Sequence, residues 1–445
     1  MLAGTILKTS AVQVVALFLG VVSGIFITRL LGPEGRGVYA VFNANSEFLA
    51  LLFGFGMGSV ITYFASNRQI PTDKLLGLSL TALATGSVLV AIVLVVLPRV
   101  GLQFPVFPEG YGSSWFRVYL LVTFTLGVAS ATLSGFLNGW QCFGETNLAK
   151  VFTATLFLAA TLGLYAGGGA GTVYRNTATV LAISLAVGLG NALLLLRFFL
   201  RNVREGIRVS LAGEAEIGIA GRFVYLVYLS ELINFFNYRL DIWLVEYFQT
   251  SYQVGLYSLA VSASQLLWLI AVPITVVLLP HLNNPDSQSE SRRLFLFYSR
   301  VTFNLTLIAG VTLFAFADRL IPLIYGAAFR DSIPSLRILI VGAVFSALAK
   351  VLSVYVLTRG LIGHNVVAVT AGVVVTLVLD LLLIPRYGIE GASLATTLSY
   401  SVILLVLMLV LRRKLDFPQV NYFLLGPEDF ALMKERIAYG RQKRL

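Results

Sequence analysis

Long apolar runs recur along the whole chain, and they constrain its fold more strongly than any other feature of the sequence. A helix of about 20 apolar residues is long enough to cross a hydrocarbon core of about 30 Å. The runs are apolar on all sides, whereas the strands of a membrane barrel alternate between apolar and polar residues. The twelve expected spans are 7–30, 38–64, 76–98, 116–138, 148–168, 176–200, 223–248, 254–280, 294–317, 333–358, 364–384 and 388–411. The sequence therefore predicts an all-α integral membrane protein with about 12 transmembrane helices.

The composition excludes several classes of protein. Of the 445 residues, 58% are hydrophobic and 12% are charged, whereas a soluble domain carries about 25% charged residues. The single cysteine, Cys142, excludes an internal disulfide, and the two histidines, His281 and His364, leave little for a metal site. The chain has no Walker motif, and no connection between spans is long enough to fold as a catalytic domain. We therefore expect no metal, no cofactor and no enzymatic activity.

The excess of basic residues is explained by membrane orientation. The net charge is +11, from 32 Lys and Arg residues against 21 Asp and Glu residues. When the N-terminus is placed in the cytoplasm and the spans alternate, 22 of the 32 basic residues lie on the cytoplasmic side. This bias predicts that both termini are cytoplasmic. Because orientation accounts for most of the excess, no nucleic-acid partner is expected.

The chain divides into two similar halves. The longest inner connection, residues 197–222, separates six spans from six spans, and the motif GVYA at 37–40 matches GLYS at 255–258 at corresponding places. Two repeats that enter the membrane in the same direction are typical of transporters with a substrate path between the halves. We expect an N-terminal six-helix bundle at 1–200, a cytoplasmic linker at 201–222, a C-terminal six-helix bundle at 223–411 and a basic cytoplasmic tail at 412–445.

The tail allows two interpretations. It is either a solvated segment that sets topology, which we favour, or a short helix that lies on anionic lipid of the inner leaflet.

Polar residues inside the seventh expected span are the main candidates for function. With about 100° of rotation per residue, five polar side chains fall within one 120° arc of this helix. These are Glu231, Asn234, Asn237, Tyr238 and Asp241. Arg239 lies roughly opposite Asp241, so it needs a cavity, a group on another helix or a route to the interface. The structural and the cavity interpretations remain equally open.

Other spans carry fewer polar residues. Tyr39, Asn43 and Glu47 share one face of the second span, and Glu47 is the only deep acidic residue of the first half. Glu47 is either a fixed partner for a basic group, which we favour, or a carboxyl that carries a proton. Gln265 is a further candidate, and Lys350 lies near the inner end of its span, where a lysine can extend to the interface.

Four segments in order resemble a known family. TRLLGPEGRGVYA at 28–40, FFNYRLDIWLVEYFQTSYQVGLYSLAVSASQLLW at 235–268, LIPLIYGAAFRDSIPSLRIL at 320–339 and LLLIPRYGIEGASLATTLSY at 381–400 are similar to segments of the Wzx-type polysaccharide-biosynthesis flippases. This family is a branch of the multidrug/oligosaccharidyl-lipid/polysaccharide exporter superfamily. The resemblance covers the chain up to about residue 411.

The resemblance implies a fold and a task. The fold would be MATE-like, with two six-helix bundles around a V-shaped central cavity. The task would be the alternating-access export of a polyprenyl-diphosphate-linked oligosaccharide across the bacterial inner membrane. Membrane lipids, a polysaccharide polymerase and chain-length regulator proteins would be partners. Arg239 is the best match by position to the family's cavity cations, with Arg29 and Arg36 at the outer mouth and Lys350 at the inner mouth.

Three alternatives are weaker. A proton- or sodium-coupled multidrug antiporter of the same superfamily typically has an acidic residue in its first helix, and residues 7–30 contain none. A membrane polysaccharide polymerase would need a sizeable outer loop, which the sequence lacks. A receptor or structural role leaves the repeat of the two halves unexplained.

Overall fold

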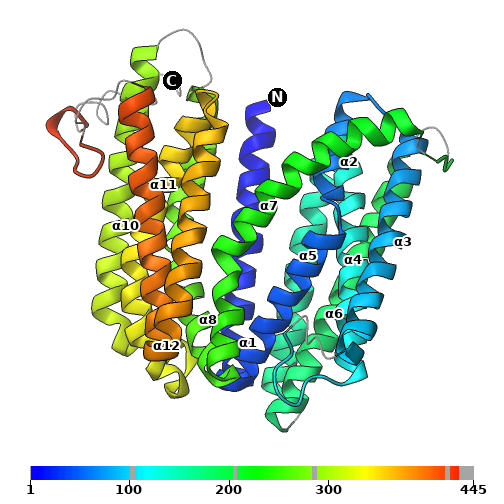
Figure 1. The fold of residues 1–445 in the computed structure, drawn as a ribbon, viewed down its shortest axis with the longest axis horizontal. Helices are drawn as coiled ribbons and strands as arrows, with labels where there is room; N and C mark the ends of the chain where they lie inside the picture. Colours follow the sequence, from blue (N-terminus) through cyan, green and yellow to red (C-terminus); the bar gives the residue numbers. More distant parts are fainter. Residues whose placement is uncertain are drawn as a thin grey trace. The chain divides into compact units, whose positions relative to one another are not determined.

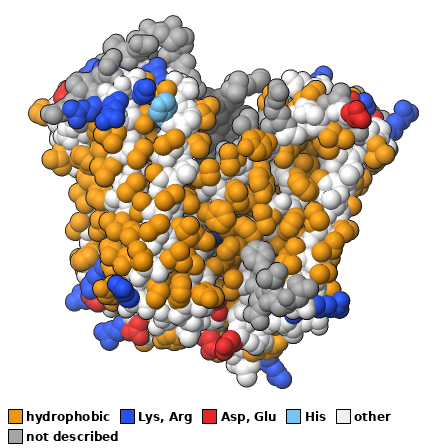
Figure 2. Space-filling view, in the orientation of Figure 1, with side chains coloured by type: hydrophobic (Ala, Val, Ile, Leu, Met, Phe, Trp, Pro, Cys, Tyr) orange, Lys and Arg blue, Asp and Glu red, His pale blue; other side chains and the backbone are white. Residues whose placement is uncertain are grey.

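The protein is helical throughout the part that the structure describes. The computed structural model describes residues 2–100, 106–169, 171–203, 208–211, 213–282, 288–415 and 421–429, and within them every regular element is a helix. The all-α prediction is therefore confirmed. On the face drawn in Figure 2, hydrophobic side chains cover the helices between their ends, and charged side chains gather near the helix ends. This distribution is the one that a bilayer requires.

Packing divides the chain into two compact units (Figure 1). Unit 1 comprises Met1–Ser258 with Ile324–Phe329, and unit 2 comprises Leu259–Leu323 with Arg330–Leu445. Unit 1 contains α1 (Leu2–Phe53), α2 (Met57–Asn67), α3 (Thr72–Val96), the 3-10 helix η1 (Leu97–Val100), α4 (Ser114–Gly139), α5 (Phe143–Ala166), α6 (Val173–Asn202), α7 (Glu214–Phe248) and the start of α8 (Ser251–Gln265). Unit 2 contains the rest of α8, α9 (Trp268–Leu282), most of α10 (Gln288–Tyr325), the end of the 3-10 helix η2 (Ala327–Ser332), α11 (Ile333–Thr358) and α12 (Ile362–Lys414).

Two of the helices contain a sharp glycine break. Gly32 in α1 has φ 64° and ψ −176°, and Gly388 in α12 has φ 56° and ψ −134°. Only glycine adopts such positive φ angles without strain, so each break fixes where one helical segment ends and the next begins. The expected spans 364–384 and 388–411 both lie in α12, and 7–30 and the first part of 38–64 both lie in α1.

The number of spans stays a prediction. Among the described residues, eight helices are long and apolar enough to cross a membrane, or nine if α8 and α9, which meet at a 43° bend, form one span. At 52 and 53 residues, α1 and α12 are each much longer than the about 20 residues that a single crossing needs. The expected second span is also interrupted after Phe53, where Phe55 and Gly56 have positive φ.

The connection before α7 packs on unit 1. Ser210 donates its backbone N–H to the carbonyl of Asp73 at the start of α3, and Lys74 forms an ion pair with Glu216 at the start of α7. The hydrogen bond from Lys74 lowers the pKa of the Glu216 carboxyl below its usual range. By packing, α7 belongs to unit 1, whereas the sequence division begins the second bundle at residue 223. The predicted repeat boundaries themselves stay a prediction.

An aromatic cluster forms a core in unit 1. Phe42 of α1 is fully buried, and its ring centroid lies 5.2 Å from that of Phe116 and 5.8 Å from that of Tyr119, both on α4. Buried aromatic pairs stabilise beyond the area that they bury. The cluster therefore fixes the second half of α1 against α4.

In unit 2, α11 is the central helix. It packs against both α9 and α12. A Cβ on Gly342 would lie 2.9 Å from the Cα of Thr397, and the Thr397 hydroxyl donates to the carbonyl of Ile338 at 3.0 Å. Small residues of this kind let membrane helices approach closely.

The closest helix approach in unit 1 joins the two glycines of the sequence repeat. A Cβ on Gly37 would lie 1.7 Å from the carbonyl oxygen of Ser251, and a Cβ on Gly255 would lie 1.7 Å from the carbonyl oxygen of Pro33. Each glycine therefore meets the residue that precedes the other glycine by four positions. The GVYA and GLYS motifs thus mark one symmetrical contact between α1 and α8.

We expect Gly37→Ala to lower the melting temperature of the detergent-solubilised protein markedly. The added methyl group collides with backbone, so the helices must separate, at a cost of about 1–3 kcal/mol. Gly24→Ala is the matched control on the same helix, because a Cβ there meets nothing within 4 Å. Equal melting temperatures for the two variants would contradict the close contact.

Candidate functional site

An ion pair joins α7 to the second half of α1. Arg239 Nε lies 2.7 Å from Glu47 Oε2, and Arg239 Nη2 lies 2.8 Å from Glu47 Oε1. Two parallel hydrogen bonds of this kind match the planar fork of arginine to a carboxylate. The side chains are 36% and 47% exposed, respectively, so the pair is only partly covered by the rest of unit 1. The structure thus brings together the two charged residues that the sequence placed deep in separate spans.

A buried frame positions this pair. Trp243 Nε1 donates to Asn45 Oδ1 at 2.9 Å, and Asn45 Nδ2 donates to the carbonyl of Val106 at 2.7 Å. The Phe48 ring lies 4.8 Å from that of Trp243 and 5.0 Å from that of Phe235. These contacts hold α7 against α1 on both sides of the ion pair. Sequence reasoning missed Asn45 and Trp243, because the polar face it identified on the second span excludes Asn45.

The predicted polar stripe of α7 is divided by packing. Asn237 and Asp241 are buried, whereas Glu231 and Asn234 are exposed. Asp241 accepts a hydrogen bond at 2.5 Å from the hydroxyl of Tyr257, which is fully buried on α8. One edge of the stripe therefore joins α7 to α8 inside unit 1, and the other edge remains accessible.

The two arginines expected at the outer mouth hold the α1 kink. Arg29 Nε donates to the carbonyl of Ile324 at 2.7 Å. Arg36 donates to both the hydroxyl and the carbonyl of Ser258 at 3.2 Å, and also to the hydroxyl of Thr28. These bonds give both guanidinium groups a role in stabilising unit 1. Binding of substrate by either arginine stays a prediction.

The remaining candidates lie in both units. Tyr39 and Asn43 are half-buried in unit 1, whereas Gln265 and Lys350 are half-buried in unit 2. Lys350 Nζ lies 4.1 Å from the centroid of the Trp268 ring, which is a cation–π contact. The extension of Lys350 toward the interface and the roles of the other three residues are not tested by these contacts.

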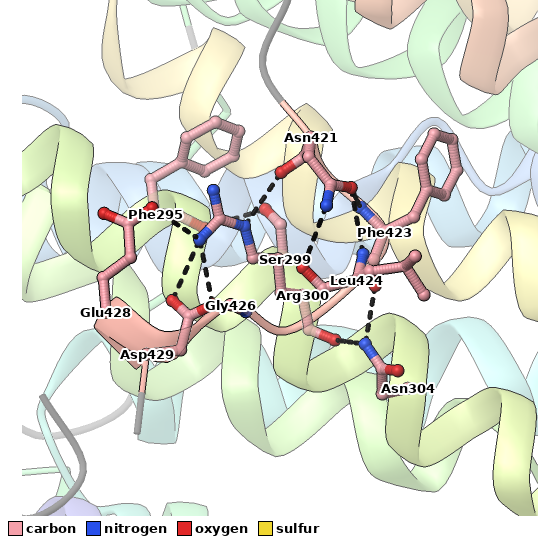
Figure 3. Close-up of polar contacts among 10 residues, drawn as sticks. All are labelled: Phe295, Ser299, Arg300, Asn304, Asn421, Phe423, Leu424, Gly426, Glu428 and Asp429. Atoms are coloured by element: carbon pink, nitrogen blue, oxygen red, sulfur yellow. Dashed lines mark hydrogen bonds and ion pairs between the residues drawn. The ribbon is translucent and has the colours of Figure 1, made fainter. Parts of the chain in front are cut away.

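A second polar cluster anchors the tail of unit 2 (Figure 3). Arg300 of α10 contacts both carboxylate oxygens of Asp429, at 2.9 and 3.1 Å, and its Nε donates to the carbonyl of Asn421 at 2.8 Å. Asn304, one turn along α10, donates to the carbonyl of Phe423 at 2.6 Å. The Arg300 and Asp429 side chains are both buried. The anchor is therefore a desolvated ion pair with satisfied backbone groups around it.

Apolar contacts complete the tail anchor. The Phe423 ring lies 5.0 Å from that of Phe303, and Tyr422 contacts Phe295 on the same helix. Burial raises the pKa of the Tyr422 phenol to about 12. Residues 421–429 are thus packed on α10, which neither prediction for the tail anticipated, and residues 430–445 lie outside the described part of the chain.

The ion pair on α1 and α7 has the chemistry of an anion site. A guanidinium fork that holds a carboxylate can hold a phosphate in the same bidentate geometry. Among the described residues, no group of three or more His, Cys, Asp or Glu side chains is placed to hold a metal ion. In the structure both donors of the Arg239 fork are occupied by Glu47.

Comparison with known sequences identifies relatives in glycan biosynthesis. A family model described as polysaccharide biosynthesis protein matches residues 26–334. The probable low-salt glycan biosynthesis flippase Agl15 of Haloferax volcanii is 22% identical over 391 residues, which cover 86% of this chain and 77% of that protein. The uncharacterized membrane protein YabM of Bacillus subtilis is 39% identical over 80 residues, 18% of this chain and 15% of that protein.

Comparison with solved structures confirms the fold. The lipid II flippase MurJ, in an inward closed conformation, has a TM-score of 0.68 and 15% identity, with 90% of this chain and 87% of that chain covered. An inward-facing multidrug resistance MATE transporter of the MOP superfamily has a TM-score of 0.70 and 16% identity, with 90% and 94% covered. At such identities the similarity concerns the fold alone.

We expect Arg300→Ala to release the tail. Removal of one partner from a buried ion pair costs about 3–5 kcal/mol, and undocking is the cheaper alternative to leaving Asp429 buried and unpaired. Hydrogen exchange at the Phe423 and Leu424 amides, both bonded to Asn421 Oδ1, should accelerate at least about tenfold. Arg293→Ala, at an exposed position on the same helix, is the control. Unchanged exchange in Arg300→Ala would contradict the anchor.

Proposed function

Because this chain belongs to the polysaccharide biosynthesis protein family, we propose that it flips a polyprenyl-diphosphate-linked oligosaccharide across the cytoplasmic membrane by alternating access. Three findings support this proposal: the family match, a relative named as a glycan biosynthesis flippase, and a fold shared with a lipid II flippase. The physical task is consistent with the fold. A glycan cannot cross hydrocarbon unaided, whereas its polyprenyl chain remains in lipid.

The half-exposed guanidinium of Arg239 is the observation that links the proposed function to a specific residue. It lies on a helix whose neighbouring polar residues are either exposed or fixed in the frame of unit 1. A diphosphate offers the oxygen pairs that an arginine fork binds. Arg239 is therefore the proposed ligand of the substrate diphosphate, with Asn234, Asn237, Tyr39, Asn43 and Gln265 as candidate partners of the glycan.

Glu47 is proposed to leave Arg239 when the substrate binds. The carboxylate occupies the same two donors that a phosphate would need, so the two anions compete for one fork. Exchange of partners at Arg239 would thus link substrate binding to the release of Glu47, the proposed ion-coupling group.

The remaining features of the proposal are the ones that the sequence predicts. Two six-helix bundles would rock around the substrate path, with both termini in the cytoplasm. A polysaccharide polymerase and chain-length regulator proteins would act on the exported glycan. The antiporter alternative shares the fold, as the MATE neighbour shows, but the family match favours a glycan substrate. Residues 7–30 contain no acidic residue, which also argues against a drug antiporter.

We expect Arg239→Ala to reduce glycan export at least about tenfold, because one charged hydrogen bond contributes about 1.5–3 kcal/mol. Surface polysaccharide is measured in cells whose own gene is deleted and replaced by the variant, with membrane levels of the protein quantified in parallel. Arg175→Ala removes the same charge from an exposed position in unit 1 and should export normally. Normal export by Arg239→Ala would contradict the role of Arg239.

We expect Glu47→Gln to uncouple transport from the ion gradient, because the glutamine cannot carry a proton. Transport of lipid-linked oligosaccharide into vesicles is measured with and without an imposed proton or sodium gradient. The variant should transport at a rate that no longer depends on the gradient. If the full gradient dependence persists in Glu47→Gln, then Glu47 is not the coupling group.

A further inference from the structure

A shallow, open groove between α2 and α4 of unit 1 is lined by six uncharged polar residues together with Gly58, Ala131 and Gly135. Its volume is about 580 Å³. The polar residues that line it are Ser59, Thr62, Tyr63 and Ser66 of α2 and Ser134 and Asn138 of α4. No Asp, Glu, Lys or Arg side chain lines it.

The outward face of α2 differs from that of the neighbouring helices. Its buried side consists of Met57, Val60, Ile61 and Phe64, and its exposed side carries Ser59, Tyr63 and Ser66. On the neighbouring helices α3, α5 and α6, large apolar side chains form most of the exposed face, for example Val88, Ile92, Phe152, Leu189 and Leu193, although Thr81, Thr85 and Thr155 are also exposed there. Apolar faces suit lipid, whereas a face of hydroxyl groups suits a polar compartment.

Helix packing does not account for these hydroxyl groups. The close contact between α2 and α4 is made by Gly58 and Gly135, since a Cβ on Gly135 would lie 2.7 Å from the carbonyl oxygen of Gly58. Ser59 and Ser66 are exposed beside this contact, not within it. Their hydroxyl groups therefore face outward, and the contact between α2 and α4 does not depend on them.

The chemistry of the groove matches an uncharged sugar. The Thr62 and Ser66 hydroxyls donate within α2, to the carbonyls of Gly58 and Tyr63, and their oxygens can still accept. Asn138 Oδ1 accepts a hydrogen bond from the Thr146 hydroxyl, so the amide N–H groups of Asn138 point away from Thr146. Hydroxyl groups, one amide and a tyrosine ring pair with sugar hydroxyls and with the apolar face of a pyranose.

We propose that this groove binds an uncharged sugar residue of the transported glycan. The inference rests on the proposed function, and it assigns the sugar to a surface separate from the arginine that holds the diphosphate. The buried side of α2 shares a core with the start of α7, where Ala220 and Val224 lie, and Arg239 lies further along that helix. Because the groove is on the exposed side of α2, the glycan would have to extend from Arg239 to that side.

The test separates the affinity for sugar from the affinity for diphosphate. Binding to the detergent-solubilised protein is measured for farnesyl diphosphate and for its esters with glucose, galactose, mannose and N-acetylglucosamine. In the wild-type protein at least one ester should bind about tenfold more tightly than farnesyl diphosphate, the equivalent of one or two net hydrogen bonds. Ser134→Leu fills the groove, so it should abolish this difference while the affinity for farnesyl diphosphate stays unchanged.

Two controls keep the test decisive. Ser184→Leu makes the same change at a half-buried position on α6 and should retain the sugar-dependent gain. Ser59→Leu repeats the test at an exposed position if Ser134→Leu fails to fold. A gain that survives in both groove variants, or wild-type affinities that are equal for all five probes, overturns the groove proposal. If the wild-type protein binds none of the probes, the proposed function itself fails.

Discussion

The lack of hydrogen-bond partners in hydrocarbon is the constraint on which this structure depends. Backbone groups must be satisfied within each crossing segment, so the spans are helices. The same constraint sorts the side chains, because a polar group that faces lipid gains nothing in return for lost hydration. Apolar side chains such as Phe152 and Leu193 are therefore exposed on α5 and α6, while the Arg239–Glu47 ion pair lies on α7 and α1 and the hydroxyl groups of the groove lie on α2 and α4. The polar residues of such a protein mark its transport path more reliably than its overall charge does.

The contact between Gly37 and Gly255 gives the sequence repeat a physical meaning. Each of the two helices supplies one glycine to the crossing. The backbones lie so close that a methyl group on either glycine would overlap the other helix. Such a contact cannot tolerate even alanine, which explains why the two motifs agree at this position while the flanking sequences differ. Next to this contact, Arg36 of α1 donates hydrogen bonds to Ser258 of α8. These bonds hold the kink of α1 against α8. A short local match thus points to a close contact between α1 and α8 within unit 1.

Sequence reasoning predicted what depends on local pattern and missed what depends on long-range contact. The apolar runs gave the helical class, because hydropathy over about 20 residues is a local property. Their positions inside the expected spans identified Arg239 and Glu47 as deep charges, but their pairing spans 192 residues and has no local signal. Asn45 was missed because the face that joins Tyr39, Asn43 and Glu47 lies away from it, and its partner Trp243 looks apolar in sequence. The tail anchor did have a signal, since Arg300 and Asn304 are one turn apart on one helix, but the acceptor segment could not be identified.

The chemistry of the two surfaces of unit 1 explains how one transporter could combine generality with specificity. A guanidinium fork binds any phosphate, so the proposed contact of Arg239 with the diphosphate would not distinguish one lipid-linked glycan from another. Discrimination requires polar groups that pair with one ligand and not with another. The hydroxyl and amide groups of the proposed groove between α2 and α4 would offer such pairing, whereas a charged lining would bind many anions alike. A division of labour between a charged site and an uncharged groove would let related chains change their glycan by substitutions in the groove and keep the diphosphate site constant.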